Sequence, residues 1–483
     1  MKNFVSTPIF YASGQPHLGH AYVSVLADAI HRYQKIIANT DGENYLLTGM
    51  DEHGQKIAEK AKEQNLREQD FVDMYAIKYK KLSDDLQIDY NRFIRTTDID
   101  HKETVKEIWL KLLESGDLYK KEYSGLYCVG CEGFKTDKDL DETGLCPDHL
   151  KAPITLTESN WFFKLSKYQD FLKDKIESDE LQIIPVARKN EILSFINEGL
   201  HDVSFSRSKS VLKWGIEVPN DDTQVMYVWC DALTNYLTAI KDTWADTDVL
   251  HVIGKDILRF HALYWPAMLR SASLKLPKKI LVHGLIKSGG IKMSKSIGNT
   301  IDPIEQMREY NSKLSENSIL GEHLGSEVFR YFVLKNISPF EDGDMTEERV
   351  KELYNADLAN GIGNLVNRVM KLSSMYLEAG FEAKTASFSK EYTESLDSLD
   401  VKTAFEYIFK LVGEADEYMQ KYQPFKVVKT DLEAGKEMLK NLREKVYLIG
   451  DLLAPFMPQT LSVIKKLVIE NKMPEKAIFP RYE

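Results

Sequence analysis

Two short segments of the chain carry side chains suited to binding phosphate. Pro16-His17-Leu18-Gly19-His20 follows the first apolar run, and Lys292-Met293-Ser294-Lys295-Ser296 follows a later apolar run. The spacing places two imidazoles one helical turn apart at an expected helix N-terminus, and two ammonium groups on a Ser/Gly-rich loop. Either segment alone is typical of a solvated surface. Together they predict a site that holds several phosphate oxygens.

Both motifs, in this order within a long α/β chain, resemble those of the class I aminoacyl-tRNA synthetases, and further segments match the methionyl enzymes among them. The resemblance extends from Thr7 to about Pro458. It implies activation of methionine with ATP, release of pyrophosphate, and transfer of methionyl to the 3′ end of tRNA(Met), the initiator included. The implied catalytic residues neutralise phosphate charge, with Mg²⁺ on the nucleotide: His17, His20, Lys292 and Lys295.

Three further residues lie in segments that border the ATP site in this family, namely Arg207, Gly254 and Asp256. Gly254 and Asp256 follow an expected strand, where glycine permits close backbone approach and a carboxylate suits a ribose hydroxyl. An ordinary strand-to-helix turn is the alternative interpretation. The resemblance implies that these three residues contact ATP together with His17, His20 and Lys295.

Several segments match those that form the methionine pocket of the family. Aromatic rings suit a thioether, because each sulfur-to-ring contact is worth about 0.3 to 1.5 kcal/mol, and a carboxylate would pair with the substrate ammonium. The implied pocket residues are Ile9, Tyr11, Asp51, Trp229, Ala232, Tyr236, Ile257, Phe260 and His261. Each aromatic residue, taken alone, is also typical of an apolar core. Ser13 and Leu233 depart from the family pattern, which commonly has asparagine and proline there.

Homocysteine lacks only the thioether methyl, which an apolar pocket distinguishes by about 1 to 3 kcal/mol. Some correction is therefore expected. The resemblance implies cyclisation of activated homocysteine within the synthetic site.

Three of the four cysteines have metal-ligand spacing. Cys128 and Cys131 form a Cys-x-x-Cys pair, and Cys146 and His149 follow in a Cys-x-x-His pair. This spacing predicts a structural Zn²⁺ in a tetrahedral knuckle. A disulfide is the alternative, although three cysteines and a histidine cannot pair evenly. Cys230 lies in the apolar run from Tyr227 to Asp231, which reads as a strand.

The hydrophobic pattern predicts an α/β fold with a Rossmann-like parallel sheet, split by the zinc-knuckle insertion and followed by an all-α C-terminal anticodon-binding domain. The expected helix covers residues 21–34, and the expected strands cover residues 4–10, 44–48, 225–229, 249–253 and 280–285. Asp51 and His53 would lie just past the carboxyl end of a strand, where open α/β sheets bind ligands. The insertion would consist of short strands and turns.

Five domain segments follow from these patterns. They are 1–118 and 223–290 for the two halves of the catalytic domain, 119–222 for the insertion, 291–346 for the lysine loop and linking region, and 347–483 for the helical domain. The polar stretch from Asn311 to Ser326 matches no part of the family pattern and is expected to form a surface loop.

The helical domain would read the anticodon. Asn364 and Arg368 lie one turn apart in a segment resembling the family helix that contacts anticodon bases, and Phe425 stands where the family most often has a stacking tryptophan. Helix packing for Asn364 and a solvated charge for Arg368 are the alternatives.

The composition of the chain limits which partners and which cellular compartment are expected. The chain has 483 residues and a net charge of −11, which argues against non-specific binding of DNA through a basic surface. It shows no apolar leader and no membrane-length apolar stretch, so we expect a cytoplasmic protein. Because the chain stops soon after the helical domain, without the C-terminal barrel by which many bacterial relatives dimerise, we expect a monomer.

Two other functions stay open at this point. One is a class I synthetase for another amino acid, with cysteine the nearest because that enzyme also uses zinc and a compact insertion. The other is a non-catalytic tRNA-binding relative, against which the intact His17, His20 and Lys295 count. A nucleotidyltransferase would explain the phosphate motifs but not the helical domain.

Overall fold

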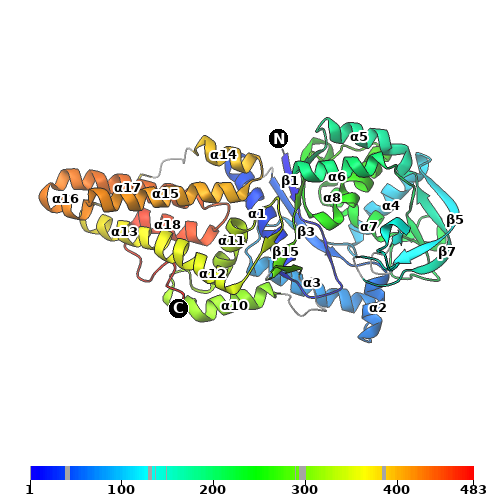
Figure 1. Ribbon diagram of the computed structural model, residues 1–483, viewed down its shortest axis with the longest axis horizontal. Helices are drawn as coiled ribbons and strands as arrows, with labels where there is room; N and C mark the ends of the chain where they lie inside the picture. Colours follow the sequence, from blue (N-terminus) through cyan, green and yellow to red (C-terminus); the bar gives the residue numbers. More distant parts are fainter. Residues whose placement is uncertain are drawn as a thin grey trace. The chain divides into compact units, whose positions relative to one another are not determined.

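The computed structural model describes residues 2–38, 44–128, 133–135, 137–147, 150–288, 290–292, 301–382 and 388–483. Figure 1 shows the helices and strands of the chain. The chain forms two compact units. The first comprises residues 1–15, 42–81 and 90–282, and the second comprises residues 16–41, 82–89 and 283–483. No helix of the described ranges combines the length and the apolar character needed to span a membrane.

The first unit is built on a parallel sheet. Within the described residues the sheet has seven strands in the order β2-β3-β1-β13-β14-β8, with β4 also paired to β3. The strands are β1 Lys2–Ser6, β2 Phe10–Tyr11, β3 Asn44–Asp51, β4 Arg92–Arg95, β8 Gln182–Ile184, β13 Thr247–Gly254 and β14 Lys279–His283. Consecutive residues of β13 are buried, among them Val249, Leu250, Val252 and Ile253. Such continuous apolar runs are typical of parallel strands covered on both faces, and the predicted α/β class is confirmed.

The helices of the first unit lie between these strands in the sequence. They are α2 Gln55–Glu63, α3 Glu68–Asp85, α4 Ile99–Glu114, α5 Gln169–Glu177, α6 Val186–Asn197, α7 Val228–Leu233, α8 Asn235–Ile240 and α9 Trp265–Ser271. The last residues of α3, from residue 82 on, belong to the second unit. Short 3₁₀ segments lie at Asp137–Asp139, Leu165–Tyr168, Lys241–Asp246 and Lys255–Ile257. A π-helical segment, Phe260–Tyr264, precedes α9.

The insertion differs from the short strands and turns expected there, because it also contains two long strands and the helices α5 and α6. Its two main strands, β5 Leu118–Cys128 and β7 Ile154–Phe163, are long and pair antiparallel from Leu118 opposite Phe163 to Tyr127 opposite Ile154 (Figure 1). The smaller strands are β6 Gly133–Lys135, β9 Val203–Ser204, β10 Ser206–Ser208, β11 Glu217–Val218 and β12 Asp221–Met226.

The expected strand at 225–229 is wrong. β12 ends at Met226 and pairs antiparallel with β10 and β11, outside the parallel sheet. The chain then forms α7, whose residues are all buried. A short, wholly apolar run fits a buried helix as well as a buried strand, so periodicity could not separate the two.

The second unit is mainly helical. Its helices are α1 Leu18–Ala38, α10 Pro303–Leu314, α11 Leu324–Asn336, α12 Glu347–Leu353, α13 Asn364–Tyr376, α14 Lys390–Asp397, α15 Val401–Tyr422, α16 Pro424–Thr430, α17 Leu432–Leu452 and α18 Pro458–Glu470. A π-helical segment, Tyr354–Gly363, joins α12 to α13, and 3₁₀ segments lie at Ser315–Asn317 and Gly321–His323. A small sheet has the order β16-β15-β17, formed by β15 Ile286–Ser288, β16 Ile291–Lys292 and β17 Gly343–Asp344.

The buried residues of the long C-terminal helices follow helical periodicity. In α15 the buried residues recur at three- and four-residue spacing, from Val401 and Ala404 to Ala415 and Met419. Figure 1 shows α13, α15 and α17 alongside one another, and their packing confirms the predicted helical C-terminal region. Asp400 accepts from the backbone N–H of Thr403 and so caps α15.

The expected surface loop at 311–326 is also wrong. Helix α10 continues to Leu314, and α11 begins at Leu324. Between them Leu320 is buried, and the Ser318 hydroxyl donates to the carbonyl of Ile478. Ser312, Lys313, Glu316 and Glu322 are exposed, which gave the stretch a loop-like composition although Ser318 and Ser326 are buried.

Candidate active site

His17 and His20 stack at the N-terminus of α1. Their ring centroids are 3.6 Å apart with planes inclined by 26°. The backbone N–H of His17 donates to Nδ1 of His20, and the backbone N–H of Gly19 donates to Nδ1 of His17. Because both Nδ1 atoms accept, the neutral rings carry their protons on Nε2. Both imidazoles thus lie at the N-terminal end of a helix, whose dipole favours anions, as their spacing predicted.

The lysine motif is described only in part. Lys292 ends β16, and its backbone pairs with that of Lys287 in β15. Lys295 lies outside the described residues, as do all residues from 293 to 300.

Four of the residues expected around methionine form one packed group of rings, which we call the ring cluster: Tyr11, Trp229, Phe260 and His261. Trp229 and Phe260 stack with centroids 3.7 Å apart and planes inclined by 4°. Tyr11 and His261 meet the Trp229 ring edge-on, at 6.3 and 6.2 Å. The chain brings them together through β2, α7 and the π-helical segment Phe260–Tyr264, a rare element that often occurs at functional sites.

Hydrogen bonds fix the imidazole of His261. Its Nδ1 lies 3.0 Å from the carbonyl oxygen of Ile257 and its Nε2 lies 2.7 Å from the hydroxyl of Tyr236. A carbonyl can only accept, so Nδ1 carries the proton and Nε2 accepts from Tyr236. Burial lowers the pKa of His261 to about 4, so the ring is neutral at neutral pH.

Ile9 and Ile257 pack against the same apolar core as Trp229, and Ala232 is buried beside it in α7. Asp51 is the last residue of β3 rather than a residue beyond it, and its side chain is 2% exposed. The backbone N–H of Ala12 donates to the carbonyl of Asp51, which fixes the end of β3 against the segment after β2. The resulting environment combines apolar rings with one buried carboxylate.

A buried carboxylate between two imidazoles was not predicted. Asp231 accepts from Nδ1 of His53 at 2.6 Å and from Nε2 of His101 at 2.7 Å. Burial alone would raise the pKa of Asp231, but His53 and His101 lower it to about 2. This group fixes α7, which carries Trp229 and Ala232, against α4 and the segment after β3. The Asp51-x-His53 spacing gave a signal for His53, whereas His101 gave none.

The three residues expected near ATP have different surroundings. Gly254 ends β13, and Asp256 is exposed in the 3₁₀ turn that follows. Arg207 is 3% exposed, and its guanidinium lies 4.7 Å from the ring of Tyr227 and 5.2 Å from that of Tyr127. Its Nη1 donates to the carbonyl of Ser206 at 2.7 Å. Arg207 is thus more buried, and has more contacts inside the protein, than expected for a residue at the edge of a site.

The expected zinc ligands are described only in part. Cys128 ends β5 and is buried, and Cys146 is buried where its backbone bridges to that of Lys151. Cys131 and His149 lie outside the described residues. In the described ranges no three His, Cys, Asp or Glu residues gather as a metal site would require.

The residues expected at the anticodon lie in the helical region. Asn364 begins α13 and is exposed, directly after the π-helical segment. Arg368 is half-buried, and its Nη1 lies 3.0 Å from the Oδ1 of Asp416. Phe425, in the first turn of α16, is half-buried.

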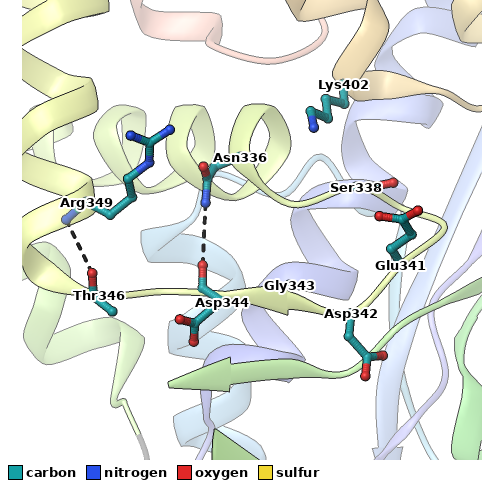
Figure 2. Close-up of a pocket in the computed structure, with 9 residues that line it drawn as sticks. All are labelled: Asn336, Ser338, Glu341, Asp342, Gly343, Asp344, Thr346, Arg349 and Lys402. Atoms are coloured by element: carbon teal, nitrogen blue, oxygen red, sulfur yellow. Dashed lines mark hydrogen bonds between the residues drawn. The ribbon is translucent and has the colours of Figure 1, made fainter. Parts of the chain in front are cut away.

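A cavity of about 310 Å³ lies in the second unit and is lined by no residue of the expected sites (Figure 2). Its polar walls come from α11, β17 and α12, with Lys402 from α15. Three carboxylates and two cations line it: Glu341, Asp342, Asp344, Arg349 and Lys402.

Two family models match the chain. The model described as tRNA synthetases class I (M) matches residues 3–152 and 149–370, and the model of the anticodon binding domain of methionyl tRNA ligase matches residues 375–477. The methionine–tRNA ligase of Campylobacter jejuni is 36% identical, over 99% of this chain and 80% of its own. That of Synechocystis is 37% identical, over 95% of this chain and 88% of its own.

A solved structure agrees with these sequence matches. Mycobacterium tuberculosis methionyl-tRNA synthetase in complex with methionyl-adenylate superposes with a TM-score of 0.87 at 33% identity, covering 100% of both chains. The family models, the relatives and this structure all name the same enzyme. The chain therefore belongs to the methionine–tRNA ligase family of class I aminoacyl-tRNA synthetases.

Proposed function

We propose that the protein activates methionine with ATP to methionyl-adenylate and transfers methionyl to the 3′ end of tRNA(Met). In the first step a carboxylate oxygen of methionine attacks the α-phosphorus, and the bond to the β-phosphate breaks as pyrophosphate leaves. In the second step the terminal ribose hydroxyl attacks the adenylate carbonyl and AMP leaves. No covalent enzyme intermediate is needed, so the protein contributes positioning and charge neutralisation.

The observation that carries this proposal is the ring cluster with its neutral histidine. Stacked and edge-on rings around Trp229 offer a thioether several sulfur-to-ring contacts. A neutral His261 presents no charge that would have to be desolvated beside an apolar side chain. The Asp51 carboxylate would pair with the substrate ammonium.

His17 and His20 would donate from Nε2 to phosphate oxygens in the transition state. Their Nδ1 atoms are already occupied by backbone donors, so the orientation of both rings is set before ATP arrives. Lys295, with Lys292, would neutralise the departing pyrophosphate. Gly254 and Asp256 would contact the nucleoside of ATP. Arg207 would support the side of the ATP site near these two residues. Mg²⁺ bound to the phosphates would neutralise further charge.

The helical region would select the tRNA. Asn364 and Arg368 would contact anticodon bases; they lie one turn apart on α13, where Asn364 is exposed and Arg368 pairs with Asp416. Phe425 would stack on a base with its half-exposed ring.

A structural Zn²⁺ would be held by Cys128, Cys131, Cys146 and His149. The two described cysteines, Cys128 at the end of β5 and Cys146, are buried, and soft thiolates suit this metal. The domain boundaries, the monomeric state, the cytoplasmic location and use of initiator tRNA stay predictions.

Charging assays test this function. Purified protein should esterify tRNA(Met) with labelled methionine, but not with cysteine, and should leave tRNA(Cys) uncharged. Charging of tRNA(Cys) with cysteine would assign the chain to another synthetase. Binding of tRNA(Met) without charging would make it a non-catalytic relative.

A further inference from the structure

The backbone that leads into the lysine motif is part of the small sheet of the second unit. Strand β15 pairs antiparallel with β16, with Lys287 opposite Lys292 and Ser288 opposite Ile291. On its other edge β15 pairs parallel with β17, with Ile286 opposite Gly343 and Lys287 opposite Asp344. The placement of Lys292 therefore depends on β17, which lies much later in the sequence.

Two aspartates flanking Gly343 bind this hairpin through their side chains. Oδ1 of Asp342 accepts from the backbone N–H of Leu285 at 2.9 Å, before β15. Oδ1 of Asp344 accepts from the backbone N–H of Gly290 at 3.0 Å, in the turn between β15 and β16. In Figure 2 both carboxylates point toward the neighbouring strand and away from α11. One carboxylate thus fixes each end of β15.

Glycines at both ends of β15 show how closely the segments approach. A Cβ on Gly284 would lie 2.3 Å from the carbonyl oxygen of Glu341, so only glycine fits there. Gly290 has φ +78°, a turn conformation that favours glycine, and it directs its N–H to Asp344.

The opposite side of β17 is anchored in the protein. Met345 and Ile337 are 0% and 1% exposed. Nδ2 of Asn336, at the end of α11, donates to the carbonyl of Asp344 at 3.4 Å. The acceptor carboxylates therefore belong to a fixed strand, while the donors belong to the hairpin that continues into the lysine motif.

We propose that Asp344 is a positioning residue for adenylate formation, which fixes the turn of the hairpin that carries Lys292 by accepting the Gly290 N–H. The inference rests on the proposed function, because Lys292 and the motif that follows act on ATP phosphates. Asp344 touches no substrate. It restricts the hairpin to the geometry needed in the transition state, so its loss lowers kcat and leaves methionine binding unchanged.

Pre-steady-state formation of methionyl-adenylate tests the proposal. The burst amplitude counts active sites, so the burst rate is independent of any fraction that fails to fold. Asp344→Ala removes the acceptor and should slow the burst about tenfold, as expected for one charge-assisted hydrogen bond, with the KM for methionine unchanged. Asp344→Asn keeps an acceptor oxygen and should stay within about threefold of the wild-type rate.

Glu341→Gln is the matched control, since Glu341 is exposed on the same segment and its side chain makes no ion pair within the described residues. It should react at the wild-type rate. A wild-type rate for Asp344→Ala, or a rate for Asp344→Asn as slow as that of the alanine variant, would overturn the positioning role. Absence of adenylate with the unmodified protein would instead overturn the proposed function, and this inference with it.

Discussion

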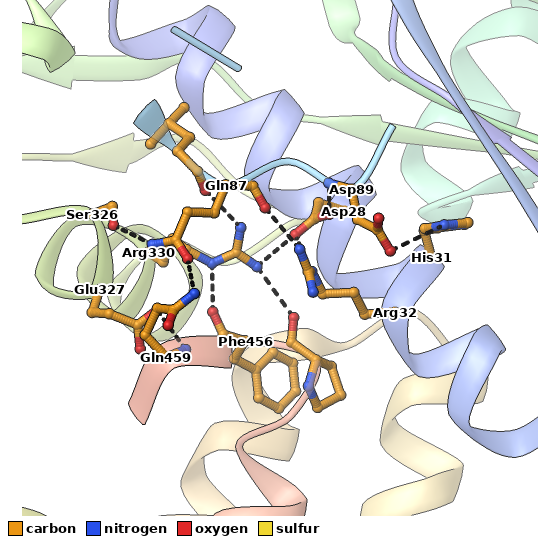
Figure 3. Close-up of polar contacts among 12 residues, drawn as sticks. Asp28, His31, Arg32, Gln87, Asp89, Ser326, Glu327, Arg330, Phe456 and Gln459 are labelled. Carbon is orange, nitrogen blue, oxygen red and sulfur yellow. Dashed lines mark hydrogen bonds and ion pairs between the residues drawn. The ribbon is translucent and has the colours of Figure 1, made fainter. Parts of the chain in front are cut away.

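Arg330 and Asp28 form an ion pair in which neither side chain is exposed, with 2.6 Å between Nη2 and Oδ2 (Figure 3). Asp28 lies on α1, the helix that begins beside the two stacked histidines. Nε and Nη2 of Arg330 also donate to the carbonyls of Phe456 and Pro455, between α17 and α18. One guanidinium therefore joins the helix of the phosphate-binding motif to the turn before the last helix.

Arg330→Met should lower the free energy of unfolding by about 3 kcal/mol, because it leaves the buried Asp28 carboxylate with fewer partners. Urea denaturation measures this. Arg349→Met is the control, since Arg349 and Glu352 form an exposed pair three residues apart, worth about 0 to 1 kcal/mol. Equal losses in the two variants would contradict a special role for the buried pair.

The pocket should favour sulfur over methylene. Phe260→Leu keeps an apolar side chain but loses the ring stacked on Trp229, so the preference for methionine over norleucine in kcat/KM should fall about threefold. Phe171→Leu is the control, because Phe171 contacts Tyr168 and Arg270 instead. An unchanged preference in Phe260→Leu would place the thioether elsewhere.

The neutral His261 predicts an acid-dependent loss of stability. Its pKa is about 4 in the folded protein and about 6.5 when exposed, so the unfolded chain binds its proton first. Stability therefore falls as pH decreases from 6.5 to 4. His261→Gln should reduce the slope of unfolding free energy against pH in this window, whereas the exposed His201→Gln should not. Parallel curves for wild type and His261→Gln would show that His261 titrates normally.

Arg368 should act on tRNA but not on activation. Arg368→Ala should raise the KM for tRNA(Met) in charging about tenfold, as expected for one lost base contact, and leave pyrophosphate exchange unchanged. Lys371→Ala, an exposed cation on the same helix, should have a smaller effect. Equal effects of both variants would indicate general phosphate attraction.

Zinc content should distinguish the cysteines. The protein should bind about one Zn²⁺ per chain, and Cys146→Ser should lose it. Cys230→Ser should retain it, because burial raises the pKa of the Cys230 thiol and keeps it protonated, whereas zinc needs a thiolate. Atomic absorption of dialysed protein gives the result, and zinc retained by Cys146→Ser would remove Cys146 from the ligand set.

The sequence predicted best the features that depend on local pattern. The apolar runs at β1, β3 and β13 and the helical periodicity of α15 and α17 each correspond to an observed element. The position of His17 and His20 at a helix N-terminus was predicted from their spacing, whereas the stacking of their rings was not. The ends of strands were predicted less well. The strand expected at 4–10 ends at Ser6, and the strand expected at 280–285 ends at His283, because an apolar run can continue past the end of a strand.

Features that depend on distant partners could not be predicted. His101 and Asp231 are far apart in the sequence, and only the folded chain brings them into contact. No sequence spacing links the two residues. The residues of α7 were predicted to form a strand. All of them are buried, and a wholly apolar run fits a buried helix and a buried strand equally well. Neither Asp342 nor Asp344 was singled out from the sequence, and only the pairing of β17 with β15 shows what their carboxylates bind.

ATP–pyrophosphate exchange across the twenty amino acids, repeated with Lys295→Ala, tests whether this protein activates methionine. We expect exchange that depends on methionine and falls at least a hundredfold in the variant, because a phosphate-neutralising charge is lost in the transition state. Exchange that depends on another amino acid, or methionine-dependent exchange that survives in Lys295→Ala, would contradict this expectation.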